Sequence, residues 1–139
     1  MSSIDKSDDL ISAALDALGR SVAPFSGFLV GAAVETASGE IFTGCNIESA
    51  SYGLTVCAER VAIWKAVSEG KRDFTRLVIA ADTESLTPPC GTCRQIIWEF
   101  AKNAEITLVN RKGDQDVVHI RELLPLAFDA RFLKEVARS

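Results

Sequence analysis

Three cysteines and one glutamate occur in two short segments, in a pattern that suits a metal ion and hydrolytic chemistry. Cys57 is followed two residues later by Glu59, and Cys90 and Cys93 form a Cys-x-x-Cys pair further along the chain. Thiolates are common ligands of Zn²⁺, and catalytic zinc sites keep one coordination position open, whereas structural sites are closed by four protein ligands. Three cysteines therefore predict one catalytic zinc ion.

Glu59 supplies the proton carrier that hydrolysis at such a site requires. Its position two residues after Cys57 places it within one helical turn of the metal, where it can reach a water molecule without binding the ion. Zinc lowers the pKa of water, so Glu59 is expected to take that proton and to deliver protons to a substrate nitrogen and to a leaving amine. The alternative interpretation is a solvent-exposed helix glutamate.

The remaining candidates for this site have weaker signals. Three thiolates on Zn²⁺ leave a net negative charge, which Arg60 and Arg94 could offset by hydrogen bonds to sulfur; the alternative is that both arginines lie on the surface. Cys45, the fourth cysteine, is expected to be a buried apolar residue and not a fourth ligand. His119, the single histidine, falls in a predicted late strand and is expected to have a structural or surface role.

The pattern of apolar residues and helix signals places both cysteine segments where a loop enters a helix. Unpaired N–H groups and the positive end of the helix dipole favour thiolate over thiol at such a position. Helices are predicted over residues 8–18, 57–69, 91–101 and 130–136, and strands over 29–36, 40–45, 77–81, 106–109 and 117–120. This order predicts an α/β fold, a three-layer α/β/α sandwich around a mixed five-stranded sheet in which 77–81 is a central strand.

Composition limits the classes of protein and partner. The 139 residues, 47% of them hydrophobic, suit a single domain spanning residues 1–139. Apolar runs are far shorter than the roughly 20 residues of a membrane-spanning helix, and the first residues lack an apolar signal core, so a soluble, cytoplasmic protein without a membrane partner is expected. The net charge of −4 argues against a nucleic-acid polymer as partner. A small neutral or cationic substrate is favoured.

These residues together resemble the cytidine deaminase family, of the short, homotetrameric type. Zinc deaminases carry a His-x-Glu or Cys-x-Glu motif followed by Pro-Cys-x-x-Cys, and residues 57–59 and 89–93 match the all-cysteine variant. Further segments that resemble the family in order are 24–28, 30–33, 44–52 and 122–128. The resemblance thus extends over nearly the whole chain.

The resemblance implies the chemistry and the residues that carry it. It implies one Zn²⁺ per subunit on Cys57, Cys90 and Cys93, with Glu59 as the proton shuttle and Arg60 as the partner of a thiolate. The implied reaction is hydrolytic deamination of cytidine and 2'-deoxycytidine to uridine and 2'-deoxyuridine, with release of ammonia.

The resemblance also implies how a small nucleoside would be held. Asn46 and Glu48 would bind a ribose hydroxyl, Phe28 would pack against the nucleoside, and the Ala58 backbone would recognise the base. One residue, Ile47, separates Asn46 from Glu48, so an extended segment would place both polar side chains on the same face. Two aromatic residues resemble side chains that reach a neighbouring subunit's site in a homotetramer: Tyr52 and Phe128.

Two departures from the family pattern bear on the fine substrate preference and not on the reaction. Family members often carry tyrosine where this chain has Val22 and Phe25, which leaves the preference among cytidine, deoxycytidine and modified analogues undecided. A deaminase of a modified cytosine nucleoside such as blasticidin S shares the metal motifs, but Glu48 argues against it. The cysteine pattern alone is also compatible with a structural zinc module in an interaction protein, a Cys-x-x-Cys redox protein or a polynucleotide deaminase.

Overall fold

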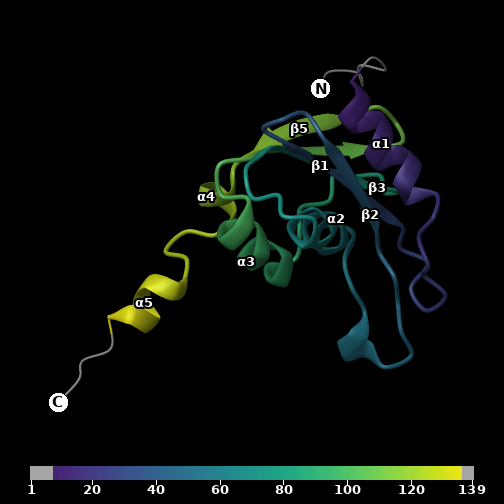
Figure 1. The fold of residues 1–139 in the computed structure, drawn as a ribbon. Helices are drawn as coiled ribbons and strands as arrows, with labels where there is room; N and C mark the ends of the chain where they lie inside the picture. Colours follow the sequence, from purple (N-terminus) through teal and green to yellow (C-terminus); the bar gives the residue numbers. More distant parts are fainter. Residues whose placement is uncertain (1–7, 136–139) are drawn as a thin grey trace.

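A mixed five-stranded sheet forms the centre of the computed structural model, which describes residues 8–135 (Figure 1). The strand order is β2-β1-β3-β4-β5; β3 and β4 run parallel, and the other neighbours are antiparallel. The strands are β1 (Val30–Thr36), β2 (Ile41–Cys45), β3 (Phe74–Ala81), β4 (Glu105–Asn110) and β5 (Gln115–Val118). The predicted α/β class and the predicted mixed sheet are confirmed.

Helices cover both faces of the sheet. One face packs against α1 (Asp9–Leu18), and the other packs against α2 (Ala58–Ser68) and α3 (Gly91–Phe100). The central strand β3 shows this division directly, because Leu77 and Ile79 belong to the α2 and α3 side while Val78 and Ala80 belong to the α1 side. Alternating side chains point to opposite faces of a strand, so a strand buried on both faces reads as a continuous apolar run.

The chain after β5 differs from the sequence prediction. Residues 117–120 were expected to form a strand, but β5 ends at Val118 and the short helix α4 (Ile120–Leu123) begins two residues later. His119 is the N-cap of α4, and its N–H donates to the carboxylate of Glu122 at 3.0 Å. A capping box of this kind starts a helix. The prediction that His119 lies in a strand is therefore wrong. The last helix is α5 (Ala130–Lys134), and residue 136 of the predicted helix lies outside the described residues.

Two loops bring the cysteine segments together at one end of β3. The chain leaves β2 at Cys45, passes through a 3-10 turn, η1 (Tyr52–Leu54), and enters α2 with Cys57 as N-cap. It leaves β3 at Ala81 and enters α3 with Cys90 as N-cap. Ligand sites in open α/β sheets lie beyond the carboxyl ends of such strands. Within residues 8–135, no helix has the length and apolar character needed to cross a membrane.

Candidate metal centre and active site

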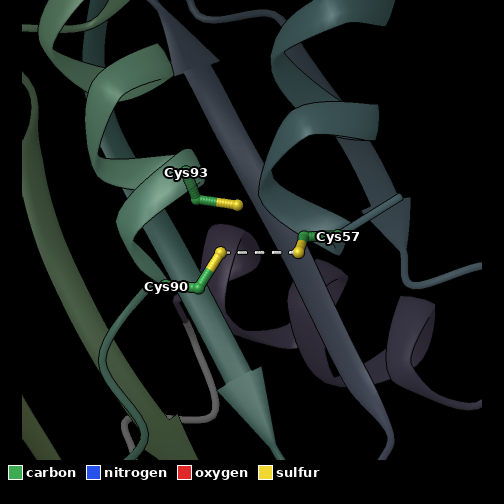
Figure 2. Close-up of side chains that lie close together, drawn as sticks. All are labelled: Cys57, Cys90 and Cys93. Atoms are coloured by element: carbon green, nitrogen blue, oxygen red, sulfur yellow. Dashed lines mark hydrogen bonds between the residues drawn. The ribbon is translucent and has the colours of Figure 1, made fainter. Parts of the chain in front are cut away.

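Three sulfur atoms converge between the N-termini of α2 and α3. The Sγ atoms of Cys57, Cys90 and Cys93 all lie within 4.8 Å of one another, and those of Cys57 and Cys90 are 3.7 Å apart (Figure 2). Two thiolates bonded to one tetrahedral zinc at ~2.3 Å would lie about 3.8 Å apart. A disulfide would require about 2.05 Å. The cluster therefore fits one Zn²⁺ ion, and all the cysteines in it are free.

The sulfur atoms of the cluster lie close enough to affect one another's protonation. A hydrogen bond from the Cys93 thiol lowers the pKa of Cys57 to about 5, and Arg60 acts in the same direction. The same hydrogen bond to Cys57, together with burial, raises the pKa of Cys93 far above its ordinary value. One thiolate thus forms readily, while a second beside it is strongly disfavoured. A divalent cation bound by the three sulfurs would offset that repulsion and allow all three to bind as thiolates.

Arg60 lies beside the cluster, whereas Arg94 does not contact sulfur. The Nη2 atom of Arg60 is 3.6 Å from Cys57 Sγ, as the role of thiolate partner requires. The guanidinium of Arg94 donates instead to two backbone carbonyls, Pro89 at 2.8 Å from Nε and Leu123 at 2.9 Å from Nη1. The expectation that Arg94 hydrogen-bonds a cysteine sulfur is therefore wrong. Arg94 ties the loop that carries Cys90 to the end of α4.

Glu59 is a buried carboxyl next to the sulfur cluster. It lies in the first turn of α2 and is only 4% exposed, which excludes a solvent-exposed glutamate. Burial raises the pKa of Glu59 to about 7, and the negative charge of Cys57 acts in the same direction. A carboxyl group that titrates near neutral pH can accept a proton and return it in the same reaction cycle.

A cavity of about 250 Å³ connects the metal cluster with the polar residues of the loop after β2. Its lining includes seven residues that the sequence assigned to metal or substrate: Phe28, Asn46, Glu48, Cys57, Ala58, Glu59 and Cys90. The motifs in the sequence do not point to the other six lining residues: Val30, Thr55, Val56, Ile79, Thr87 and Pro88. Thr55 and Val56, and likewise Thr87 and Pro88, directly precede the metal motifs, so adjacency to those motifs was the available signal. A volume of this order suits a small molecule.

Asn46 and Glu48 line the cavity and also hold the loop that carries Phe28. The side chain of Asn46 accepts a hydrogen bond from the N–H of Val30 at 3.0 Å and donates to the carbonyl of Phe28 at 2.7 Å. The carboxylate of Glu48 accepts from the N–H of Phe25 at 3.0 Å and from the N–H and hydroxyl of the next residue, Ser26. These hydrogen bonds hold the pKa of Glu48 below its ordinary value, and the bond from the Ser26 hydroxyl has the largest effect.

Two aromatic residues predicted for the substrate site do not reach the cavity within one chain. Tyr52 is 77% exposed and packs edge-to-face on Phe25, with ring centroids 6.2 Å apart. Phe128 is 57% exposed and stacks on Phe132 at 5.8 Å. The structure therefore brings neither ring to the cysteine cluster. Their predicted contacts would require another copy of the chain.

Cys45 and His119 lie outside the site. The sulfur of Cys45 is 3.5 Å from the carbonyl oxygen of Arg20 and is not part of the three-cysteine cluster. Cys45 is half-buried, not fully buried as the sequence suggested. His119 is an exposed helix cap. Neither residue competes with the ligand set that the sequence predicted.

Comparisons with known proteins agree with this geometry. A family model described as "Cytidine and deoxycytidylate deaminase zinc-binding region" matches residues 4–109. A cytidine deaminase of Halalkalibacterium halodurans is 44% identical over 127 residues, which are 91% of this chain and 96% of that protein. A crystal structure of cytidine deaminase from Burkholderia pseudomallei matches with 43% identity and a TM-score of 0.83, covering 86% of this chain and 96% of that one. A blasticidin-S deaminase of Bacillus cereus is 36% identical over 107 residues, covering 71% of this chain and 76% of that protein. The chain belongs to the cytidine and deoxycytidylate deaminase family of zinc-binding proteins.

Proposed function

We propose that this chain catalyses the zinc-dependent hydrolytic deamination of cytidine and 2'-deoxycytidine, giving uridine or 2'-deoxyuridine and ammonia. The observation that carries the proposal is a single cavity with the buried Glu59 and two of the three clustered cysteines at one end and Asn46 and Glu48 at the other. The end with Glu59 and the cysteines suits the hydrolytic removal of an amino group. The end with Asn46 and Glu48 suits the binding of a sugar that carries hydroxyl groups.

Glu59 moves the protons of the reaction. When bound by the three thiolates, zinc lowers the pKa of water and so supplies a nucleophile near neutral pH. Glu59 takes the proton released by that water and passes it to the ring nitrogen next to the reacting carbon. The second proton, released as the new hydroxyl becomes a carbonyl, goes by way of Glu59 to the amino group, which leaves as ammonia. A pKa of about 7 suits both transfers.

The nucleoside would be held by contacts from two directions. Ala58 is the first residue of α2, where backbone N–H groups have no partner within the helix and can bind a polar edge of the base. Phe28 lines the cavity and offers a ring face. Asn46 uses one amide hydrogen for the carbonyl of Phe28, which leaves its second for a sugar hydroxyl, while Glu48 accepts from that hydroxyl.

We also propose a homotetramer in which neighbouring copies complete the pockets. Figure 1 shows η1 and α5 projecting away from the sheet. The exposed Tyr52 is the first residue of η1, and the exposed Phe128 lies two residues before α5. Exposed aromatic rings at projecting segments are typical of interfaces. Light scattering of the eluted protein should give four times the 15.0 kDa chain mass, and a monomer would contradict the proposal.

Deamination of a modified cytosine nucleoside is the second candidate, since one relative is a blasticidin-S deaminase. Glu48 favours the unmodified nucleosides, because it lines the cavity as an ionised acceptor suited to a sugar hydroxyl. Side-by-side assays of the zinc-loaded protein on cytidine, 2'-deoxycytidine, cytosine and blasticidin S test the choice. We expect turnover of the two nucleosides and little of cytosine. A higher kcat/KM on blasticidin S would reverse the assignment.

A further inference from the structure

We infer that Ser26 is a positioning residue for the nucleoside: its hydroxyl fixes the Glu48 carboxylate relative to Phe28 and thereby sets the affinity for sugars that carry a ring hydroxyl. The inference rests on the proposed function, because it takes Glu48 as the acceptor for the sugar. Ser26 itself does not line the cavity that holds Glu59. It therefore acts through Glu48 and does not touch the reacting atoms.

The Ser26 hydroxyl joins two parts of the substrate site. It donates to Oε2 of Glu48, and it accepts a hydrogen bond from the N–H of Phe28 at 3.0 Å. The other oxygen of Glu48 accepts from the N–H groups of Phe25 at 3.0 Å and of Ser26 at 3.1 Å. The hydroxyl is thus the one side-chain group, among the described contacts, that binds both Glu48 and the backbone of Phe28.

These contacts leave Glu48 with one acceptor position for a substrate. A carboxylate offers about four lone-pair positions, and three donors occupy three of them. The remaining position is on Oε2, the oxygen that the Ser26 hydroxyl holds. Because Glu48 lines the cavity, a sugar hydroxyl can use this position. Without the Ser26 hydroxyl, Oε2 loses its only protein donor among the described residues, and the carboxylate can rotate away from the orientation that binds the sugar.

Asn46 holds the opposite end of the same loop. Its side chain binds the carbonyl of Phe28 and the N–H of Val30, so Phe28 is fixed from one side by Asn46 and from the other by Ser26. Loss of the Ser26 hydroxyl leaves the Asn46 contacts intact. The effect of the substitution should therefore appear in sugar binding more than in the integrity of the loop.

The test is the substitution Ser26→Ala assayed on cytidine, 2'-deoxycytidine, 3'-deoxycytidine and 2',3'-dideoxycytidine. We expect KM to rise about tenfold for cytidine with kcat within twofold of the wild type, as for loss of a hydrogen bond to a charged group. For 2',3'-dideoxycytidine, KM should not change, because the sugar then lacks the ring hydroxyls. The two monodeoxy substrates identify the hydroxyl concerned. An equal rise in KM on all four substrates, or a fall in kcat alone, would overturn the inference.

Matched variants separate positioning from a general effect on structure. Ser26→Thr keeps the hydroxyl and should restore most of the affinity. Ser38→Ala removes a serine hydroxyl that also binds a carboxylate, Glu40 at 3.0 Å, but in the β1–β2 turn, and it should leave KM unchanged. In a Glu48→Gln background, Ser26→Ala should have little further effect, and a full tenfold effect there would contradict the mechanism.

The outcomes distinguish this inference from the proposed function. If the zinc-loaded wild type turns over neither cytidine nor 2'-deoxycytidine, both fail. If the wild type is active and Ser26→Ala has the wild-type KM on every substrate, only the role of Ser26 fails. Should Ser26→Ala unfold at a lower temperature, Ser26→Cys, which keeps the size of the side chain but is a weak donor, provides the same comparison of substrates.

Discussion

Ile47 and Val56 form a reciprocal backbone pair, in which each N–H donates to the other's carbonyl at 3.0 Å. Val56 directly precedes the metal ligand Cys57, and Ile47 lies between Asn46 and Glu48. The pair therefore joins the segment proposed to bind the sugar to the segment that binds the metal. These two backbone hydrogen bonds, together with the bond from the N–H of Ser49 to the hydroxyl of Thr55 at 3.0 Å, hold the two ends of the cavity at a fixed distance.

Replacing Glu59 by glutamine should abolish most of the activity and leave the metal in place. Glutamine has nearly the same shape but cannot carry protons, so kcat should fall by about 10²- to 10⁴-fold. Glu59 is not one of the clustered ligands, so the variant should still hold one zinc per chain by elemental analysis. Glu69→Gln at the exposed end of α2 is the control and should behave like the wild type. A Glu59→Gln enzyme with wild-type kcat would refute the role of Glu59 as proton carrier.

Gly44→Ala should disturb the metal centre from a distance. A Cβ atom at Gly44 would lie 2.4 Å from the carbonyl oxygen of Ala58 and 2.6 Å from the nitrogen of Ala62, so α2 must move away from β2. We expect a loss of about 1–3 kcal/mol in the free energy of unfolding, the usual cost of overpacking, and weaker zinc binding because Cys57 begins this helix.

Gly53→Ala is the matched control, since a Cβ atom there meets nothing within 4 Å. Urea unfolding and competition with a chromogenic chelator measure the two effects. If Gly44→Ala matched Gly53→Ala in both measurements, the close approach of α2 to β2 would not matter to the site.

Arg94→Lys should weaken zinc binding without removing a ligand. The planar guanidinium reaches the carbonyls of Pro89 and Leu123 together, which the single ammonium of lysine cannot reproduce in the same geometry. The loop before Cys90 should then be held less well, and zinc affinity should fall by about tenfold, as for other residues that orient metal ligands. Arg121→Lys, on the exposed side of α4, should leave the affinity unchanged. Equal zinc affinities for the two variants would exclude this role of Arg94.

The sequence was sufficient for the metal centre because residue type and spacing determine the ligands. Cys57, Cys90 and Cys93 had only to be placed at two helix starts for their sulfurs to meet. The contact between Arg94 and Leu123 could not be predicted in the same way, since it depends on where α4 packs. Adjacency to Cys93 suggested a bond to sulfur, whereas tertiary structure directs the guanidinium to backbone carbonyls.

Two local features escape prediction from the sequence for physical reasons. The apolar residues from Val117 to Ile120 resemble a strand, but Ile120 is buried as the first residue of α4, and the spacing of His119 and Glu122 was the available sign of a helix start. The chain has Val22 where family members often have tyrosine, and the type of this side chain does not indicate any role in the site. In the structure its backbone N–H and carbonyl pair with the neighbours of Ile47, a contact that does not depend on the side chain.

The stability of the fold should depend on pH through Asp8. The guanidinium of Arg76 and backbone N–H groups in the first turn of α1 donate hydrogen bonds to the Asp8 carboxylate, the shortest being 2.8 Å from Arg76 Nη2 to Oδ2. These bonds hold the pKa of Asp8 below its ordinary value of 3.8. The folded state therefore favours the ionised form, and this stabilisation is present above about pH 4 and is lost as the pH falls through and below 3.8. Asp8→Asn keeps the helix cap but loses the charge, and should lower the free energy of unfolding by about 1 kcal/mol at pH 7.

The difference between Asp8→Asn and the wild type should shrink as the pH falls toward 3. Asp16→Asn is the control, because it removes the charge that pairs with Arg20 on the surface, where the Arg20 and Asp16 side chains are 57% and 77% exposed. It should change the free energy of unfolding by less than about 0.5 kcal/mol. Thermal or urea unfolding at several pH values measures both variants. A destabilisation by Asp8→Asn that stayed constant with pH would rule out the ion pair as its cause.

The proposed deamination depends above all on zinc at the three cysteines acting together with Glu59. The most direct test is to titrate metal-free protein with zinc while measuring the rate of cytidine deamination and the zinc bound per chain. We predict that the rate rises in proportion to bound zinc and reaches its maximum at one ion per chain. Full activity in the metal-free protein, or no turnover of cytidine once each chain holds its zinc, would contradict the claim.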